Sequence, residues 1–489
     1  MKKISKVLIA NRGEIALRII RACKELEIKS VVVFSEADVN GVWVPRADEC
    51  YPIMGNPVEA YLNFHKIIDL AKKSDCDAIH PGYGFLSESA EFAQACADHG
   101  LIFIGPKPHH IGLFGDKMAS KVAMKKIGVP VLEGTDTPVV NKAEGEKIAT
   151  EIGFPIIIKA AFGGGGRGMR IVYHAEDFSD MFDSATNESM KYFARDEVFI
   201  EKYVENPRHI EIQVVADAYG NVVHLGERDC SIQRRHQKVI EITPSPLLND
   251  ATRQKLADIS VNAMKDLGYE SVGTVEFLLD VEDNIYFIEM NTRVQVEHPV
   301  SEIVTGVDII QRMIEIAGGD KLLYKQEEIN FRGYAIEFRI NSEDPQNKFM
   351  PTAGTVKKYL TPGGPGVRLD TSLYAGYELP TCYDSMLGKL IVSALTWEGA
   401  VAKAKRALDE YLIEGFKTNI PLHREIVRDA DFKAGKFNTG YLDSNMKHFK
   451  MEAKSHIADE EAKSAKLADM LKIIKENNLV SLKNDFTLY

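Results

Sequence analysis

Residues 271–291 of the chain read SVGTVEFLLDVEDNIYFIEMN, two apolar runs separated by the polar residues 282–284. Two such runs around a short polar turn predict a tight β-hairpin. If the turn is centred between residues 282 and 283, Glu276 lies directly opposite Glu289. A turn shifted by one residue makes the two glutamates diagonal neighbours on the same face. Either register places two carboxylates side by side on one face of a sheet.

Two carboxylates that face each other across strands repel and destabilise the sheet. A hard cation between Glu276 and Glu289 would remove that penalty, and Asn291 offers a third oxygen on the same face. A small set of oxygen ligands is typical of Mg²⁺ or Mn²⁺ sites that are completed by water and nucleotide phosphates. The alternative is a pair of solvated carboxylates at a sheet edge.

Polar side chains continue directly after the hairpin, on a segment predicted to be extended. Arg293, Gln295 and Glu297 are at alternate positions of this segment, so their side chains are predicted to lie on the same side. An arginine fork binds a planar oxyanion at two points. A glutamate two positions further on the same side is placed to take a proton from that anion. Arg339, within the predicted strand 335–341, adds a second fixed cation.

A glycine-rich loop lies upstream, with five glycines in the six positions 163–168, between apolar runs at 155–161 and 169–173. Backbone N–H groups in such a loop approach a phosphate closely. The Gly-Lys-Ser/Thr of a Walker loop is missing, so the pattern favours a mobile flap that closes over a nucleotide. Lys117 and Lys159 are candidate phosphate partners. A merely flexible hairpin tip is the alternative.

Residues 207–214 alternate strictly, so that His209, Glu211 and Gln213 share one face of a predicted strand. This polar face suits the wall of a cleft, although the pattern alone fits a solvated strand surface about equally well. The loop 233–238 that follows concentrates cations and indicates an anion pocket, or else a solvated basic turn.

The N-terminal hundred residues alternate between strand and helix periods, with strands expected at 6–10 and 30–34 and a helix at 14–27. Such alternation predicts an α/β, doubly wound parallel sheet covered on both faces. A dinucleotide-binding fold competes, but the first turn, 11–14, holds one glycine where that fingerprint needs three.

Composition sets wider limits. The 489 residues predict about three domains. The 60 basic and 71 acidic residues give a net charge of −11, which argues against a nucleic-acid protein but not against a small anionic substrate. The N-terminal apolar run is too short for a signal peptide, and no apolar stretch is long enough for a membrane span. Six scattered cysteines fit reduced thiols and a cytoplasmic location.

Five motifs in order carry a family resemblance: residues 9–16 (IANRGEIA), 80–88 (HPGYGFLSE), the glycine loop, 289–299 (EMNTRVQVEHP) and 383–386 (YDSM). With them the chain resembles the biotin carboxylases, which are ATP-grasp enzymes, from about residue 6 to 442. The resemblance implies an N-terminal domain at 1–115 and an ATP-grasp domain at 116–330 with a mobile lid at about 131–203. A C-terminal biotin carboxylase domain would occupy 331–446, followed by a charged helical tail at 447–489.

The resemblance also implies a two-step reaction, in which ATP phosphorylates bicarbonate and the carboxyl group then passes to biotin. Residues that would line the ATP site are Lys117, Lys159, Gly164, Gly165, Gly166, Met169, Glu201, Lys202, Val204, His209, Gln233, His236 and Leu278. Two Mg²⁺ or Mn²⁺ ions would be held by Glu276, Glu289 and Asn291. Bicarbonate would lie against Lys238, Arg293, Gln295 and Val296, with Glu297 as the base and with Arg339 and Tyr83 close to biotin.

No biotinylation motif and no carboxyltransferase segment are found, so we expect a separate biotin carrier protein or biotinylated carboxyltransferase subunit, and a homodimer. Residues 417–423 and 437–442 favour the subunit of a two-subunit pyruvate carboxylase over that of acetyl-CoA carboxylase. In the tail, Leu467, Met470, Leu471 and Ile474 form an apolar stripe that docks either on a partner subunit or on its own chain. A different ATP-grasp ligase and a non-catalytic homologue remain alternatives.

Overall fold

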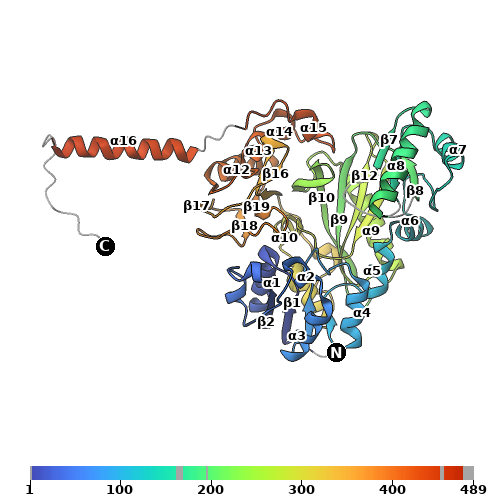
Figure 1. Cartoon of the computed structure of the whole chain (residues 1–489), viewed down its shortest axis with the longest axis horizontal. Coiled ribbons are helices and arrows are strands. Elements are labelled where there is room, and N and C mark those ends of the chain that lie inside the picture. Colours follow the sequence, from blue (N-terminus) through green and yellow to red (C-terminus); the bar gives the residue numbers. More distant parts are fainter. Residues whose placement is uncertain (1–2, 161–168, 194–196, 452–455, 477–489) are drawn as a thin grey trace.

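The computed structural model describes the chain except for residues 1–2, 161–168, 194–196, 452–455 and 477–489 (Figure 1). The glycine loop, with Gly164, Gly165 and Gly166, therefore lies outside the described residues. No helix in the described part of the chain is long and apolar enough to cross a membrane.

The N-terminal residues form the expected parallel sheet, with strand order β3-β2-β1-β4-β5. On β1 (Lys6–Ile9), Val7 and Ile9 pack into one apolar cluster while Leu8 packs into another, so both faces of the sheet are buried. The other elements of this region are α1 (Gly13–Glu25), β2 (Lys29–Phe34), β3 (Glu49–Pro52), α2 (Pro57–Leu62), α3 (Phe64–Lys73), β4 (Ala78–His80), α4 (Ala90–Asp98), β5 (Ile102–Phe103) and α5 (Pro108–Gly115). The predicted doubly wound class is confirmed.

A small three-stranded sheet of order β7-β6-β8 flanks the undescribed loop. Its strands are β6 (Ile156–Ala160), β7 (Met169–Val172) and β8 (Val198–Lys202), and its helices are α7 (Lys142–Ile152) and α8 (Phe178–Phe193). The helix α6 (Lys117–Lys126) precedes them and begins at Asp116, whose side chain accepts from the N–H groups of residues 118 and 119.

An antiparallel eight-stranded sheet, of order β13-β12-β9-β10-β11-β14-β19-β18, forms the centre of the molecule. Its strands are β9 (Arg208–Ala216), β10 (Val222–Arg234), β11 (Gln237–Thr243), β12 (Ser271–Leu279), β13 (Ile285–Asn291), β14 (Tyr334–Asn341), β18 (Val367–Thr371) and β19 (Met386–Ala394). Because β11 pairs with β14, the sheet continues across residue 330, where a domain boundary was expected. The division into domains stays a prediction.

The helices of this half of the chain are α9 (Asp250–Asp266), α10 (His298–Thr305), α11 (Ile309–Ala317), α12 (Trp397–Glu410), α13 (Ile420–Ile426), α14 (Ala430–Lys433), α15 (Tyr441–Asn445) and α16 (His456–Glu476). Short strands complete it: β15 (Glu343–Asp344), β16 (Met350–Pro351), β17 (Lys358–Leu360) and β20 (Leu412–Glu414). Figure 1 shows α16 extending away from the rest of the chain. Leu467, Met470 and Leu471 are exposed there, and the side chain of Ile474, the fourth residue of the predicted stripe, lies outside the described part of the chain, so where this stripe docks stays a prediction.

The hairpin β12–β13 pairs Glu276 with Glu289, as predicted, but for a different reason. The strands nearest the turn follow a register centred on residue 282, which would place Ile288 opposite Glu276. A β-bulge between Phe277 and Glu276 skips one residue and brings Glu289 into that position. The bulge also reverses the alternation of β13, so that Met290 joins the apolar core and Glu289 turns to the polar face.

Candidate active site

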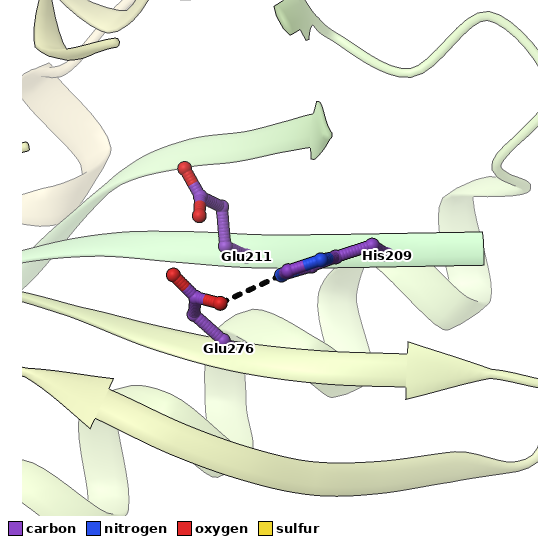
Figure 2. A group of neighbouring side chains, drawn as sticks. All are labelled: His209, Glu211 and Glu276. Carbon is purple, nitrogen blue, oxygen red and sulfur yellow. Dashed lines mark hydrogen bonds and ion pairs between the residues drawn. The ribbon is translucent and has the colours of Figure 1, made fainter. Parts of the chain in front are cut away.

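One face of the central sheet is lined by polar side chains, as the alternation of residues 207–214 predicts. On β9, Ile210, Ile212 and Val214 pack into the apolar core, whereas His209, Glu211 and Gln213 lie buried on the opposite face. Figure 2 shows His209, Glu211 and Glu276 gathered between β9 and β12. His209 contacts Glu276 at 2.7 Å between Nε2 and Oε2. These polar side chains are buried, which excludes the solvated strand surface, and the role of this face as a cleft wall stays a prediction.

Arg228, on β10, organises the floor of this face and was not predicted from the sequence. It is completely buried, and its guanidinium donates to five side chains: Glu211, Gln213, Thr274, Gln295 and Ser301. The Nε–Oε1 distance to Glu211 is 2.5 Å. A charged Glu-Arg-Asp run inside an otherwise apolar strand pattern, 227–229, was the signal in the sequence.

Glu276 receives hydrogen bonds from four side chains, which are His209, Lys238, Asn291 and Gln295. Burial alone would raise the pKa of Glu276, but Lys238 and His209 lower it well below its ordinary value. The carboxylate is therefore ionised and already neutralised within the protein.

Glu289 is in a different environment. Its side chain is 39% exposed, and its nearest cation is Lys117, at 3.8 Å between Nζ and Oε2. Asn291 donates to Glu276 through Nδ2 and accepts from Arg293 at Oδ1. The pair of opposed carboxylates thus has one member, Glu289, whose oxygens are available to a cation from solvent. Its oxygen donors fit Mg²⁺ or Mn²⁺.

Glu297 lies between two cations. Lys238 Nζ is 2.8 Å from its Oε1, and Arg339 Nη2 is 2.9 Å from its Oε2. Burial opposes ionisation of Glu297, but Lys238, Arg339 and Arg228 hold its pKa well below the ordinary range. The carboxylate can accept a proton at neutral pH, although a low pKa makes it a weak base.

The segment that carries Glu297 departs from the prediction. The strand ends at Asn291, Arg293 lies in a bend, and Glu297 lies in the turn that begins α10. This turn still directs Gln295 and Glu297 to the same site, because Gln295 contacts Glu276 and Glu297 contacts Lys238. Arg293 contacts Glu88, at 3.0 Å from Nε, and Asn291. Lys238 and Arg339 thus meet at Glu297, whereas Arg293 is linked to the polar face through Asn291, which bonds Glu276.

Tyr83 reaches this region through a chain of contacts between distant segments. Its hydroxyl donates to Glu14 on α1, and Glu14 lies 3.1 Å from Lys389 Nζ. Lys389, which is fully buried, donates at 3.0 Å to the backbone carbonyl of Val296. The N-terminal sheet is therefore connected to the turn that carries Glu297.

The residues expected around a nucleotide fall on two sheets. On the small sheet, Lys159 and Lys121 both bond Glu201, at 2.5 and 3.1 Å. Burial would raise the pKa of Glu201, but the two lysines lower it to about 2. Lys121 was not predicted; one lysine in a helix pattern gave no signal.

The remaining expected nucleotide residues are less closely connected. Lys202 donates to the carbonyls of Gly153 and Phe154 rather than to another site residue. Gln233 contacts His209, and His236 is exposed in the turn between β10 and β11. Met169 pairs with Lys159 across β6–β7, and Val204 and Leu278 are half-buried.

A pocket opens beside Lys238 and Arg339. Its other lining residues are Arg234, Gln237, Val239, Asn341, Glu343, Phe349 and Asn419. Arg234 stacks on Phe349, 3.9 Å from the ring centre. Lys238 and Arg339 both line the pocket and both contact Glu297, so the pocket lies next to Glu297.

Comparison with known proteins agrees with this geometry. A family model described as "Biotin carboxylase, N-terminal domain" matches residues 3–111, and "Biotin carboxylase C-terminal domain" matches residues 337–444. Between them, "Carbamoyl-phosphate synthase L chain, ATP binding domain" matches residues 116–325. The chain belongs to the biotin carboxylase family and has its ATP-grasp fold.

Individual relatives are similar over almost the whole chain. The 2-oxoglutarate carboxylase small subunit of Hydrogenobacter thermophilus is 51% identical, over 90% of this chain and 93% of that protein. A pyruvate carboxylase subunit of Methanothermobacter thermautotrophicus is 48% identical, over 94% and 93%. A solved biotin carboxylase domain dimer of the Hydrogenobacter enzyme, in complex with MgADP, ADP and bicarbonate, matches with a TM-score of 0.89 at 50% identity, covering 93% of this chain and 100% of that one.

Proposed function

We propose that the protein carboxylates biotin on a separate carrier, using ATP and bicarbonate through carboxyphosphate. The single observation that carries the proposal is the placement of ionised Glu297 between Lys238 and Arg339, at one end of a face that also holds Glu276 and Glu289. Positioned cations and a carboxylate base are what a weak, planar nucleophile such as bicarbonate requires.

In the first step, bicarbonate held by Lys238, Arg293, Gln295 and the Val296 backbone loses its proton to Glu297. Its oxygen attacks the γ-phosphorus of ATP, and ADP leaves. In the second step, the carboxyl carbon of carboxyphosphate bonds to N1 of biotin while its bond to the phosphate oxygen breaks, and the released phosphate takes the proton that N1 loses. Arg339 would stabilise the enolate-like charge that develops on biotin, with Tyr83 nearby.

Glu276, Glu289 and Asn291 would hold Mg²⁺ or Mn²⁺, which neutralises phosphate charge when bound. Around the nucleotide we place Lys117, Lys159, Met169, Glu201, Lys202, Val204, His209, Gln233, His236 and Leu278, together with Gly164, Gly165 and Gly166 of the undescribed loop. The domain division at residues 115, 330 and 446 belongs to the same proposal. A homodimer and a cytoplasmic location are supported by the dimeric relative and by six cysteines that form no disulfide.

The test is ADP release by purified protein with and without bicarbonate, and then with free biotin. We expect ATP cleavage that depends on bicarbonate and rises with biotin. Cleavage that is equally fast without bicarbonate would contradict the proposal and favour another ATP-grasp activity.

Replacing Glu289 with Gln is expected to raise the Mg²⁺ concentration for half-maximal activity by about tenfold or more, because a coordinating charge is lost. Titration of ADP release against Mg²⁺ measures the effect. Glu282→Gln, an exposed carboxylate in the turn of the same hairpin, is the matched control. Equal Mg²⁺ dependence in both variants would remove Glu289 from the metal site.

For the carboxyl acceptor we propose pyruvate, which the 48% identity to a pyruvate carboxylase subunit supports, although a 2-oxoglutarate carboxylase subunit is 51% identical. With its biotinylated partner, ATP and bicarbonate, the protein is expected to form oxaloacetate from pyruvate. Pyruvate, 2-oxoglutarate and acetyl-CoA offered separately distinguish the alternatives. Malonyl-CoA, or carboxylated 2-oxoglutarate, as the product would overturn pyruvate while leaving the carboxylation of biotin intact.

A further inference from the structure

Two buried carboxyl groups, Glu241 and Glu337, face each other behind Arg339. The register of β11 and β14 pairs them directly, and both side chains are 0% exposed. Arg339 Nε donates to Oε1 of Glu241 at 2.5 Å. The other oxygen of Glu241 and both oxygens of Glu337 are buried without a hydrogen-bond partner among the described residues. Two full negative charges in this arrangement would be strongly unfavourable.

The neighbouring cations already have other partners. Lys238, on β11, bonds Glu211, Glu276 and Glu297. Lys389, on β19, bonds Glu14 of α1 and the Val296 carbonyl.

The remaining ionisable groups near the pair supply no further positive charge. Glu297, at the start of α10, is an anion, and burial keeps the Cys230 thiol of β10 neutral by raising its pKa well above the ordinary value. His298, on α10, is neutral because burial lowers its pKa. In the described part of the chain, Arg339, on β14, is thus the cation that hydrogen-bonds the pair, through Glu241, whereas Lys389 acts on Glu337 without a hydrogen bond and opposes the rise of its pKa.

Burial raises the pKa of both glutamates. It raises the pKa of Glu241 to about 7, although Arg339 opposes the rise, and it raises the pKa of Glu337 well above its ordinary value. Two interacting acids of this kind titrate as a pair.

Arg339 is held along two edges, by Glu241 at Nε and by Glu297 at Nη2, and it lines the pocket beside Lys238. We propose that Glu241 and Glu337 share one proton, and that the single negative charge left on the pair, carried by Glu241, holds Arg339 in the orientation in which it faces the pocket. The two glutamates are positioning residues. Their role in the reaction rests on the proposed function, which assigns Arg339 to biotin.

Thermal unfolding of the full chain between pH 6 and pH 9 tests the shared proton without requiring any activity. An acid whose pKa is raised by folding loses stability as the pH rises towards that folded pKa. Glu337→Gln removes this titration, so its Tm minus that of the wild type should increase with pH. Glu302→Gln, which changes another buried glutamate bonded to an arginine, Arg18, controls for general effects. A difference for Glu337→Gln that is flat or falls with pH would overturn the shared proton.

Kinetics with free biotin test the positioning role. Glu241→Gln should raise KM for biotin about tenfold with a smaller change in kcat, because a neutral amide anchors the guanidinium less strongly than a carboxylate. Glu337→Gln should keep KM within about twofold at pH 7, because its side chain is already neutral. An unchanged KM in Glu241→Gln would overturn the positioning role. Wild-type protein without biotin-dependent ATP cleavage would instead overturn the proposed function, while unfolding would still decide the shared proton.

Discussion

Replacing Glu297 with Gln is expected to lower turnover about 10²-fold or more and to leave nucleotide affinity nearly unchanged. The carboxylate is ionised between Lys238 and Arg339, and an amide of the same shape cannot accept the proton. Steady-state ADP release and calorimetric titration with nucleotide measure the two quantities separately.

Glu227→Gln is the matched control, because Glu227 is also a buried carboxylate bonded to an arginine but lies outside the polar face. It should retain turnover. A Glu297→Gln variant with normal turnover would exclude Glu297 as the base, and one that loses nucleotide affinity would show a structural role instead.

Replacing Arg228 with Leu is expected to lower the free energy of unfolding by about 3–5 kcal/mol and to abolish activity. The guanidinium is completely buried and bonded to Glu211 and to four neutral side chains, so its removal leaves a buried carboxylate with Lys238 as its remaining partner. Denaturant unfolding measures the loss.

Arg253→Leu provides the comparison, since Arg253 also bonds a buried glutamate but is 29% exposed, so that water can replace part of its contact. Its loss should be clearly smaller. Equal losses in the two variants would show that Arg228 has no special part in holding the site.

The alternation of apolar residues was sufficient to predict the main elements near the site. It predicted the first two strands of the N-terminal sheet, the polar face of β9 and the hairpin 271–291, because side-chain period follows directly from secondary structure, but it did not predict β3. The bulge at Ile288 could not be read from that pattern, since a bulge depends on how two strands pair and not on either strand alone.

The sequence did not predict the site residues whose role depends on contacts with distant side chains. Arg228 and Lys121 become significant only when their partners, Glu211 and Glu201, are brought beside them by the fold. The same is true of the connection from Tyr83 through Glu14 to Lys389, which joins segments more than 300 residues apart. Contacts of this kind are long-range, and local pattern contains no information about them.

The most direct measurement of the proposed activity follows the carbon of bicarbonate. Purified protein is incubated with isotopically labelled bicarbonate, ATP, Mg²⁺ and free biotin, and the biotin is then separated and analysed for label. We expect acid-labile label on biotin in an amount that depends on ATP and matches the biotin-stimulated release of ADP. ATP cleavage without label on biotin would contradict the assignment of this chain as an enzyme that carboxylates biotin.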